Sequence, residues 1–287
     1  MQPQDQTIQL REVKLHLRVW QPAVTRPNPP AFLLLHGLSS NARTWDRVAG
    51  QLAQAGYLAV AADQRGHGLS DKPEAGYDFA TITRDLKELV AALGMDRPIL
   101  AGQSWGGNVV LEAAARYPEI SRGLVFVDGG FLELGSRGKW EDVSRELRPP
   151  DLAGLPRAEI VNRIGEMFPE WVPEGVEMTL GNFQQFEDGT VRPWLPLRHH
   201  MAILRALYDQ DVEALFPQVH LPVLICPADD GTDWSERKRT QVENAAARLP
   251  HAEVHWFIGA AHDIHVDQPV HLAQAMLAFA ARLEKSL

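Results

Sequence analysis

One short stretch carries a serine in a setting that suits nucleophilic chemistry. Gly102, Ser104 and Gly106 form a G-x-S-x-G pattern between an apolar run at 99–101 and a helix-like stretch at 108–118. A sharp turn there would raise the serine oxygen above the strand end, and the glycines leave room for that turn. The free N–H groups and positive dipole end of the helix would point at the serine. Such a setting suits an alkoxide and a developing oxyanion, so the pattern predicts a nucleophile at Ser104.

Two other apolar runs end in residues that belong at the same edge of a sheet. The run at 31–35 leads to Gly37, which permits a tight turn that directs the backbone N–H of Leu38 toward that edge. The run at 123–127 ends at Asp128. In an open α/β sheet the active site lies beyond the carboxyl ends of the strands, so we expect these groups to lie near the serine.

Apolar runs alternate with helix-like stretches over most of the chain. Runs typical of buried strands are at 31–35, 57–62, 99–101, 123–127, 221–226 and 252–258. Helix-like stretches are at 44–56, 79–93, 108–118, 236–249 and 269–283. The alternating stretches at 7–13 and 15–20 predict two antiparallel strands. The pattern predicts an α/β fold with a mostly parallel, doubly wound sheet.

The stretch 131–216 breaks this alternation. It has no buried-strand run and instead carries seven prolines, three tryptophans and helix-like pieces at 157–168 and 198–209. We interpret it as a mainly helical cap inserted into a core formed by 1–130 and 217–287. Caps exclude water and shape the substrate pocket. The candidate pocket residues are Gly37, Phe131, Trp140 and Trp194.

Composition and charge exclude several classes of partner. The net charge is −9 and there is no dense Lys/Arg cluster, so a nucleic-acid partner is not expected. The first twenty residues lack the apolar core of a signal peptide, and no apolar run approaches the ~20 residues of a membrane span. The single cysteine, Cys226, lies in an apolar run and predicts a small core residue in a reducing cytoplasm. No motif indicates a metal or cofactor, so a small-molecule substrate is the partner expected.

Four motifs, taken together, connect these observations to a known family. They are HGLSSN at 36–41, DQRGHGLSDKP at 63–73, GQSWGG at 102–107 and GAAHDIHVDQP at 259–269. Their order along the chain is oxyanion loop, serine, carboxylate, histidine, as in the α/β-hydrolase fold. The sequence resembles the α/β-hydrolase superfamily, in its capped, esterase-like group, over essentially its whole length.

The resemblance implies a role for individual residues. Ser104 would be the nucleophile and His262 the base that activates it and later protonates the leaving group. His265 competes for the base, but the family places a proline seven residues after its catalytic histidine, and Pro269 stands seven after His262. The oxyanion hole would use the backbone N–H groups of Leu38 and Trp105.

The acid of the triad is open between two loops. Capped members of the family usually carry it after the penultimate strand in a G-x-x-D context, but here Ala228 replaces the glycine and Gly231 stands where the aspartate belongs. Asp229 or Asp230 would serve only after a one-residue shift. Some members place the acid after the strand that follows the nucleophile helix, which is the position of Asp128. We favour Asp128, with Asp230 and Asp229 as alternatives.

The expected function is that of a serine hydrolase, specifically a carboxylic ester hydrolase for a small to medium, partly apolar substrate. Haloalkane dehalogenases and epoxide hydrolases share the fold but need aspartate where Ser104 stands. Lactonase, amidase, C–C bond hydrolase and cofactor-free perhydrolase activities remain open, because the same triad supports them. An alternative hypothesis, from another functional class, is a ligand-binding or signalling protein with slow or no turnover. The retention of every catalytic motif argues against it.

Overall fold

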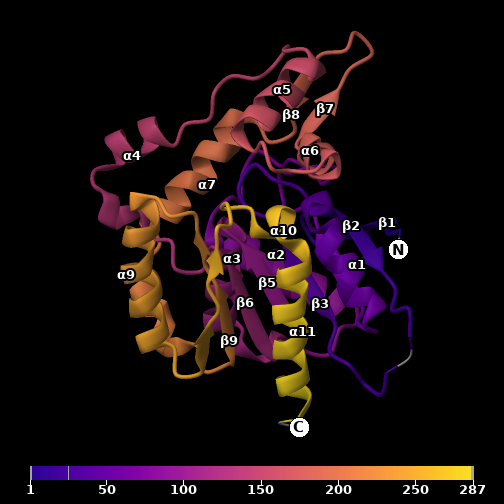
Figure 1. Cartoon of the computed structure of the whole chain (residues 1–287), viewed down its shortest axis with the longest axis vertical. Coiled ribbons are helices and arrows are strands. Elements are labelled where there is room, and N and C mark those ends of the chain that lie inside the picture. The colour runs from indigo at the N-terminus through magenta and orange to yellow at the C-terminus, as the bar shows by residue number, and fades with distance from the viewer. Residues whose placement is uncertain (1, 25, 286–287) are drawn as a thin grey trace.

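The computed structural model describes residues 2–24 and 26–285, apart from the side chains of residues 233 and 234. Within these residues, eight strands form one sheet in the order β1-β2-β4-β3-β5-β6-β9-β11 (Figure 1). The strands are β1 (Gln4–Gln9), β2 (Lys14–Trp20), β3 (Phe32–Leu35), β4 (Ala59–Ala62), β5 (Ile99–Gln103), β6 (Gly123–Val127), β9 (Val223–Cys226) and β11 (Ala252–Val254). Neighbours from β4 to β11 are parallel, whereas β2 is antiparallel to both β1 and β4. The predicted α/β fold with a mostly parallel sheet is confirmed.

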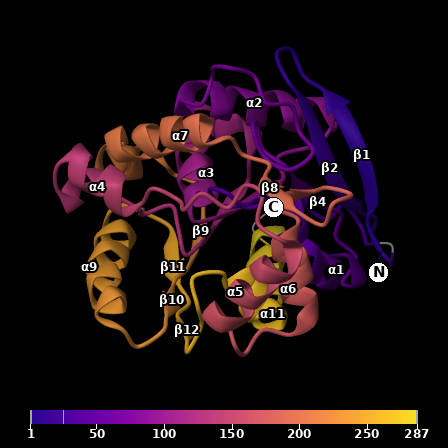
Figure 2. The ribbon, with the colours of Figure 1, turned by 90° about the horizontal axis from the view of Figure 1, so that it is seen from above.

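Helices cover both faces of this sheet (Figure 2). One face carries α1 (Asp46–Gln54) and α11 (Pro269–Lys285), which contact each other. The other face carries α2 (Phe79–Ala92), α3 (Trp105–Arg116) and α9 (Asp233–Arg248). Alternate residues of each strand enter the two apolar layers, as Leu33 and Leu35 do on one side of β3 and Phe32 and Leu34 on the other. Burial on both faces explains why the strands read as continuous apolar runs.

The last predicted strand, at 252–258, is two strands in the structure. After β11, β12 (Phe257–Ile258) leaves the large sheet and pairs with β10 (Ala228–Asp229). Pro227 lies between β9 and β10 and has no N–H to donate, so the hydrogen-bond ladder is interrupted at this point. The break starts a separate two-stranded ladder at the edge where β9 ends.

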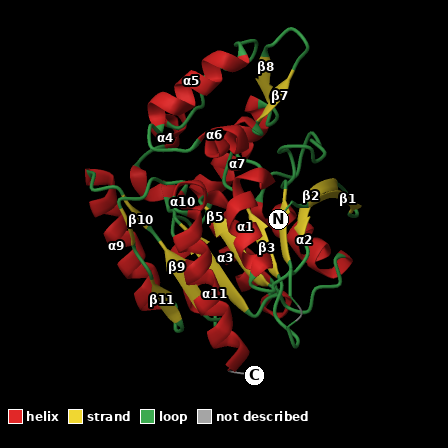
Figure 3. Cartoon of the chain, turned by 45° about the vertical axis from the view of Figure 1, so that its right-hand side comes forward, coloured by secondary structure: helices red, strands yellow, loops and turns green. Residues whose placement is uncertain are grey.

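The segment 131–216 lies beyond the end of the sheet at which α10 (Ile264–Asp267) is found (Figures 1 and 3). Its elements are α4 (Trp140–Glu146), α5 (Arg157–Met167), α6 (Pro173–Leu180), β7 (Phe183–Gln185), β8 (Val191–Pro193) and α7 (Leu197–Asp209). The short hairpin β7–β8 is an element that the sequence pattern did not predict. Part of this segment has a small apolar cluster of its own, made of Ile160, Ile164, Leu180 and Val191.

The remaining elements are short connections. They are the helix α8 (Val212–Leu215) and the 3-10 turns η1 (Ala42–Trp45), η2 (Pro118–Ile120), η3 (Leu134–Arg137) and η4 (Phe216–Gln218). The helix predicted at 44–56 therefore begins as η1 and continues as α1. None of the helices in the described part of the chain is both long and apolar enough to cross a bilayer.

Candidate active site

Ser104 occupies the turn between β5 and α3. Its backbone has φ 52° and ψ −122°, a conformation that costs free energy for a residue with a side chain. The turn is possible because Gly106 packs against the end of β3, where an added Cβ would lie 2.6 Å from the carbonyl oxygen of His36. The predicted strand–turn–helix setting of this serine is therefore what the structure contains.

The loop after β3 lies directly against this turn. A Cβ built on Gly37 would overlap Gln103 Oε1 and lie 3.1 Å from the Cβ of Ser104, so this loop packs closely against the serine turn. The N–H groups of Leu38 and Trp105 have no hydrogen-bond partner among the described residues. Two unpartnered backbone donors beside a serine are the arrangement that stabilises an oxyanion.

A buried histidine holds this loop in place. The backbone N–H of Gln64 donates to His36 Nε2 at 3.1 Å, which leaves Nδ1–H to donate to the carbonyl oxygen of Gly37 at 2.8 Å. Burial lowers the pKa of His36, so the imidazole is neutral, as this pair of bonds requires. Gln64 also donates from its side chain to the carbonyl oxygen of His36 at 2.7 Å.

Asp128 and His262 are brought together across 134 residues of chain. His262 Nδ1 lies 2.6 Å from Asp128 Oδ2, and the Asp128 side chain is 1 % exposed whereas that of His262 is 49 % exposed. Asp128 follows β6 with φ 44°, and the next residue, Gly129, packs so closely that a Cβ there would overlap the carbonyl oxygen of Ser104. Ser104 Oγ makes no hydrogen bond to any described residue.

The charges of this pair are coupled. Burial opposes ionisation of Asp128, but the hydrogen bond and charge of His262 and the charge of Lys238 outweigh it, so the pKa of Asp128 is lowered. Desolvation lowers the pKa of His262, but the hydrogen bond and charge of Asp128 outweigh it, and the net shift is upward. An ionised Asp128 accepts the Nδ1–H of His262, which leaves Nε2 as a proton acceptor.

Lys238 is a member of this cluster that sequence reasoning missed. It lies on α9, and its Nζ is 2.9 Å from Asp128 Oδ2 and 2.8 Å from the carbonyl oxygen of Ala228. In the sequence it is one of several charged residues in the predicted helix at 236–249. No local pattern distinguishes it, because its contact with Asp128 spans 110 residues.

The two alternative acids have other partners. Asp229 forms an ion pair with Arg239 and accepts from the backbone N–H of Gly231 at 3.1 Å. Asp230 accepts from the hydroxyls of Thr232 and Ser235, both at 2.7 Å. These bonds lower the pKa of Asp230 to about 2. Neither carboxylate forms a hydrogen bond with His262.

His265, the alternative base, is enclosed in the protein. It is 0 % exposed, its ring centroid lies 4.8 Å from that of Trp45, and neither ring nitrogen has a hydrogen-bond partner among the described residues. Burial lowers its pKa to about 3, so it is neutral. The structure therefore places His262, and not His265, against Asp128.

A cavity of about 800 Å³ lies between the segment 131–216 and the loops of the core. It begins at Ser39 and Ser40, immediately after Leu38, and includes His67, whose ring stacks on Trp105 at 5.5 Å. Its charged lining residues are Lys72, Arg148, Arg192, Arg198 and Asp151. Four cations and one carboxylate line this space in a chain whose net charge is −9.

Of the predicted pocket residues, Trp194 lines this cavity, with the ammonium of Lys72 4.8 Å from its ring centroid. Gly37 lies against Ser104, as described above. Phe131 is fully buried in the core, and Trp140 packs edge-on against Tyr208 at 5.4 Å. Neither of these two aromatic residues lines the cavity.

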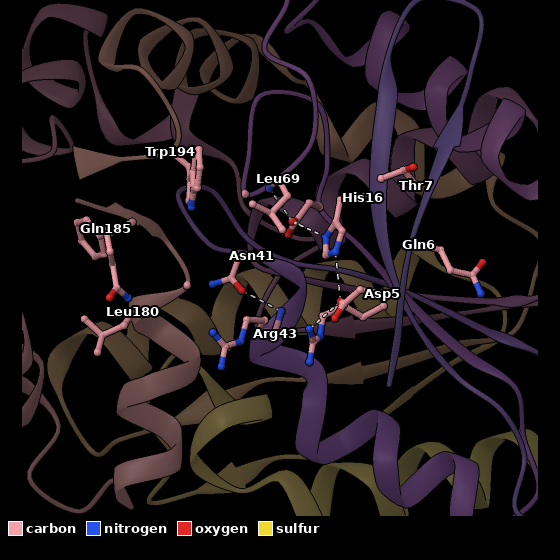
Figure 4. Close-up of a pocket in the computed structure, with 15 residues that line it drawn as sticks. Asp5, Gln6, Thr7, His16, Asn41, Arg43, Leu69, Leu180, Gln185 and Trp194 are labelled. Carbon is pink, nitrogen blue, oxygen red and sulfur yellow. Dashed lines mark hydrogen bonds and ion pairs between the residues drawn. The ribbon is translucent and has the colours of Figure 1, made fainter. Parts of the chain in front are cut away.

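A second cavity, of about 700 Å³, adjoins the first at Trp194 and reaches the strand β1 (Figure 4). His16 is central to it and bonds Asp63 through Nδ1 at 2.9 Å and Asp5 through Nε2 at 3.2 Å. Asp63 also accepts from the backbone N–H of Ala42 at 2.7 Å, and its pKa is lowered to about 2. These bonds brace the start of η1, so the loop at 63–73 supports the core.

Comparison with known proteins agrees with the fold. The model of the alpha/beta hydrolase family matches residues 32–275. This chain belongs to that family. An uncharacterized protein of Mycobacterium tuberculosis is 35 % identical over 166 residues, which are 55 % of this chain and 47 % of the relative. The 2-(acetamidomethylene)succinate hydrolase of Mesorhizobium japonicum is 38 % identical over 99 residues, or 34 % of this chain and 35 % of that protein.

A solved structure of E-2-(acetamidomethylene)succinate hydrolase is similar over nearly all of both chains. It covers 96 % of this chain and 98 % of its own, with a TM-score of 0.78 and 23 % identity. This likeness concerns the fold alone. The chain spans about half or less of the length of the curated relatives reported above. Family membership supports hydrolase chemistry.

Proposed function

We propose that this alpha/beta hydrolase is a serine hydrolase that cleaves carboxylic esters through an acyl-enzyme on Ser104. The observation that carries the proposal is the 2.6 Å bond between Asp128 and His262, at the strand edge that also carries Ser104. The N–H groups of Leu38 and Trp105, which have no partner among the described residues, would stabilise the negative charge that forms on the substrate's carbonyl oxygen. In this proposal Asp128 is the acid of the triad, and the segment 131–216 is a cap on a core formed by 1–130 and 217–287.

Acylation would begin when Ser104 Oγ bonds to the ester carbonyl carbon while its proton passes to His262 Nε2. The negative charge then forms on the carbonyl oxygen, where the N–H groups of Leu38 and Trp105 stabilise it. Collapse of this intermediate breaks the bond to the alcohol oxygen, and His262 returns the proton to the leaving alcohol. Asp128 holds the imidazole in the required tautomer throughout.

Deacylation would repeat these steps with water as the nucleophile. Water gives a proton to His262 Nε2 as its oxygen bonds to the acyl carbon, and the second tetrahedral intermediate uses the same two N–H donors. Its collapse breaks the bond to Ser104 Oγ, which takes the proton back from His262. The carboxylic acid is released and the free serine is restored.

The lining of the first cavity includes neither Ser104 nor His262, but it starts at Ser39, next to Leu38, and its charge supports a substrate class. Arg192 bonds to an amide and Lys72 to backbone carbonyls, so neither forms a direct ion pair with a carboxylate among the described residues, although the charges of Asp63 and Asp71 act on Lys72. A substrate that combines an apolar acyl part with a carboxylate would pair with both cations. The name of the Mesorhizobium relative, a hydrolase of a succinate derivative, supports the same class. We place the protein in the cytoplasm with a small-molecule substrate.

The test is hydrolysis of 4-nitrophenyl esters with acyl chains from C2 to C12, on wild type and Ser104→Ala, beside a fluorophosphonate label. Turnover and labelling that both vanish in Ser104→Ala are the expected result. The matched pair 4-nitrophenyl hexanoate and mono-4-nitrophenyl adipate tests the anionic substrate, with a lower KM expected for the adipate. Labelling without ester turnover would shift the proposal to lactones, amides or C–C bonds. A protein that shows neither labelling nor turnover would contradict the proposal and favour a ligand-binding protein.

A further inference from the structure

The buried Lys238 has no task in the acyl-transfer steps above. Its side chain is 8 % exposed, and its Nζ lies 2.8 Å from Asp128 Oδ1 and 2.9 Å from Asp128 Oδ2. A third contact, at 2.8 Å, is with the carbonyl oxygen of Ala228. An ammonium group has three N–H donors, so the number of acceptors matches the number of donors. A lysine is rarely buried unless its charge is paired, and here Asp128 pairs the charge of Lys238.

Lys238 and His262 share one oxygen of the acid. Asp128 Oδ2 accepts from His262 Nδ1 at 2.6 Å and from Lys238, whereas Oδ1 accepts from Lys238 and from the backbone N–H of Ala228 at 2.9 Å. The carboxylate is therefore held by two elements, by α9 through Lys238 and by β10 through Ala228. Rotation of the carboxylate away from His262 would break contacts with Lys238 as well.

The charge of Lys238 acts on His262 through the same carboxylate. A buried, unpaired carboxylate would strongly favour the protonated imidazolium next to it. The ammonium balances that negative charge, so the imidazolium gains less from it. In agreement, Asp128 raises the pKa of His262 and Lys238 lowers it.

We propose that Lys238 is a positioning residue that acts through Asp128, keeping His262 in its neutral, proton-accepting form and its Nδ1–H directed at Oδ2. The proposal rests on the proposed function, because it assumes that His262 is the base. It predicts a working range that extends to lower pH than an Asp–His pair alone would allow.

Other charged groups surround this cluster and do not replace Lys238. Asp263 follows His262 directly and raises its pKa. Burial, together with the charges of Asp128 and of Asp267 on α10, raises the pKa of Asp263 in turn. His265 is neutral because burial lowers its pKa to about 3. The charge of Lys238 also acts on Asp230, whose carboxylate accepts from the hydroxyls of Thr232 and Ser235. Among the described groups that act on His262, Lys238 is the cation.

The first test measures the protonation of His262 without turnover. NMR titration of the His262 imidazole is carried out in the Ser104→Ala background, alone and combined with Lys238→Met, Lys238→Gln or Lys238→Arg. The expected result is a rise of about one unit in the pKa of His262 with Met and with Gln, and a return toward the parent value with Arg. Arg248→Gln, which removes an exposed cation from the same helix, is the matched control and should change nothing.

The second test is the pH dependence of kcat/KM on a 4-nitrophenyl ester. The acid limb should move upward with Met and Gln by the same amount as the NMR value, with the plateau rate within about tenfold of wild type. Lys238→Gln keeps a hydrogen-bond donor, so it decides the matter if circular dichroism shows that Lys238→Met does not fold.

Two results would overturn the proposal. One is a pKa of His262 that stays within about 0.2 units of the parent in both neutral variants. The other is a loss of plateau rate with an unmoved acid limb, which is the behaviour of a purely structural brace. Absence of any esterase activity in wild type would count against the proposed function and not against this role of Lys238. The two are separable because the NMR titration measures the effect of Lys238 on His262 and needs no turnover.

Discussion

The loops at the strand ends and the segment 131–216 are built in different ways. In the loops, Asp128, His36 and Asp63 are almost completely buried, and each is held by at least two hydrogen bonds. Parts of the segment 131–216, such as Phe131, Ile203 and Phe216, join the main core. Its outer elements α5, α6 and β8 have a small apolar cluster of their own and exposed ion pairs such as Arg157–Glu177. Exposed pairs contribute about 0–1 kcal/mol each, so these outer elements are held less firmly than the loops. The groups proposed for the chemistry are held in one geometry, whereas the elements proposed to select the substrate tolerate more change.

Buried amides join the two regions, among them Asn108 on α3 and Asn41, whose Nδ2 donates to the carbonyl oxygen of Met178 and to Asn182 Oδ1. Asn108 on α3 accepts from the N–H of Gly130 at 2.9 Å, which fixes the loop that carries Asp128. Its Nδ2 donates to the carbonyl oxygen of Leu132 at 2.8 Å and to Gln210 Oε1 at 2.7 Å. Asn108 therefore ties Leu132 and Gln210, near the two ends of the segment 131–216, to the core. Tyr77 and Ser39 hold α7 against the core through His199 and His200.

The largest effect should follow a change of the acid in the core. Asp128→Asn removes the charge that stabilises the imidazolium and the acceptor that selects its tautomer, so kcat should fall about 10³–10⁴-fold with the fold retained. Steady-state kinetics and circular dichroism check this. The matched control is Asp230→Asn, which should change kcat less than about threefold; a larger loss there than in Asp128→Asn would reverse the choice of acid.

A pair of glycine substitutions contrasts the packing of the two regions. Gly129→Ala introduces a Cβ that overlaps the carbonyl oxygen of Ser104, so it should displace the serine turn, cost about 1–3 kcal/mol and lower kcat/KM at least about 100-fold. Gly165→Ala on α5 meets nothing within 4 Å and should stabilise the helix by up to about 1 kcal/mol. Thermal unfolding and ester kinetics measure both, and equal behaviour of the two variants would contradict the comparison.

The pH dependence should report on the core alone. The pKa of His262 is raised above its ordinary value of about 6.5, and only the neutral imidazole accepts a proton. The rate constant kcat/KM should therefore be constant at high pH and fall about tenfold per unit as the pH drops below that pKa. Trp194→Ala should leave this acid limb where it is. An acid limb well below 6 would contradict the coupling of His262 to Asp128.

The smallest effects should come from the aromatic residues of the segment 131–216. Trp194→Ala removes a wall of the cavity, so KM should rise about three- to tenfold while kcat changes little. Trp140→Ala, which loses its contact with Tyr208, should change KM less than twofold or so and lower the melting temperature instead. A large fall in kcat for Trp194→Ala would show that this segment takes part in the chemistry.

Local signals in the sequence predicted the framework of the site. The apolar runs that become β3, β5 and β6 are continuous because both faces of a parallel sheet are covered, and this pattern is legible without a structure. The glycines around Ser104 predicted the turn because that turn excludes side chains at close range. Such features depend on neighbouring residues, which is why they can be derived from the order of amino acids alone.

The partners of the ionisable groups were decided by the tertiary structure. Asp128, Asp229 and Asp230 all follow apolar runs, and nothing local separates a carboxylate that reaches His262 from one that pairs with Arg239. Lys238 was invisible for the same reason, because its contact depends on how α9 packs against β10. Pro227, which interrupts the last strands, had its effect only once β9 and β11 were neighbours. Contacts across more than 100 residues are set by packing, and local patterns do not contain them.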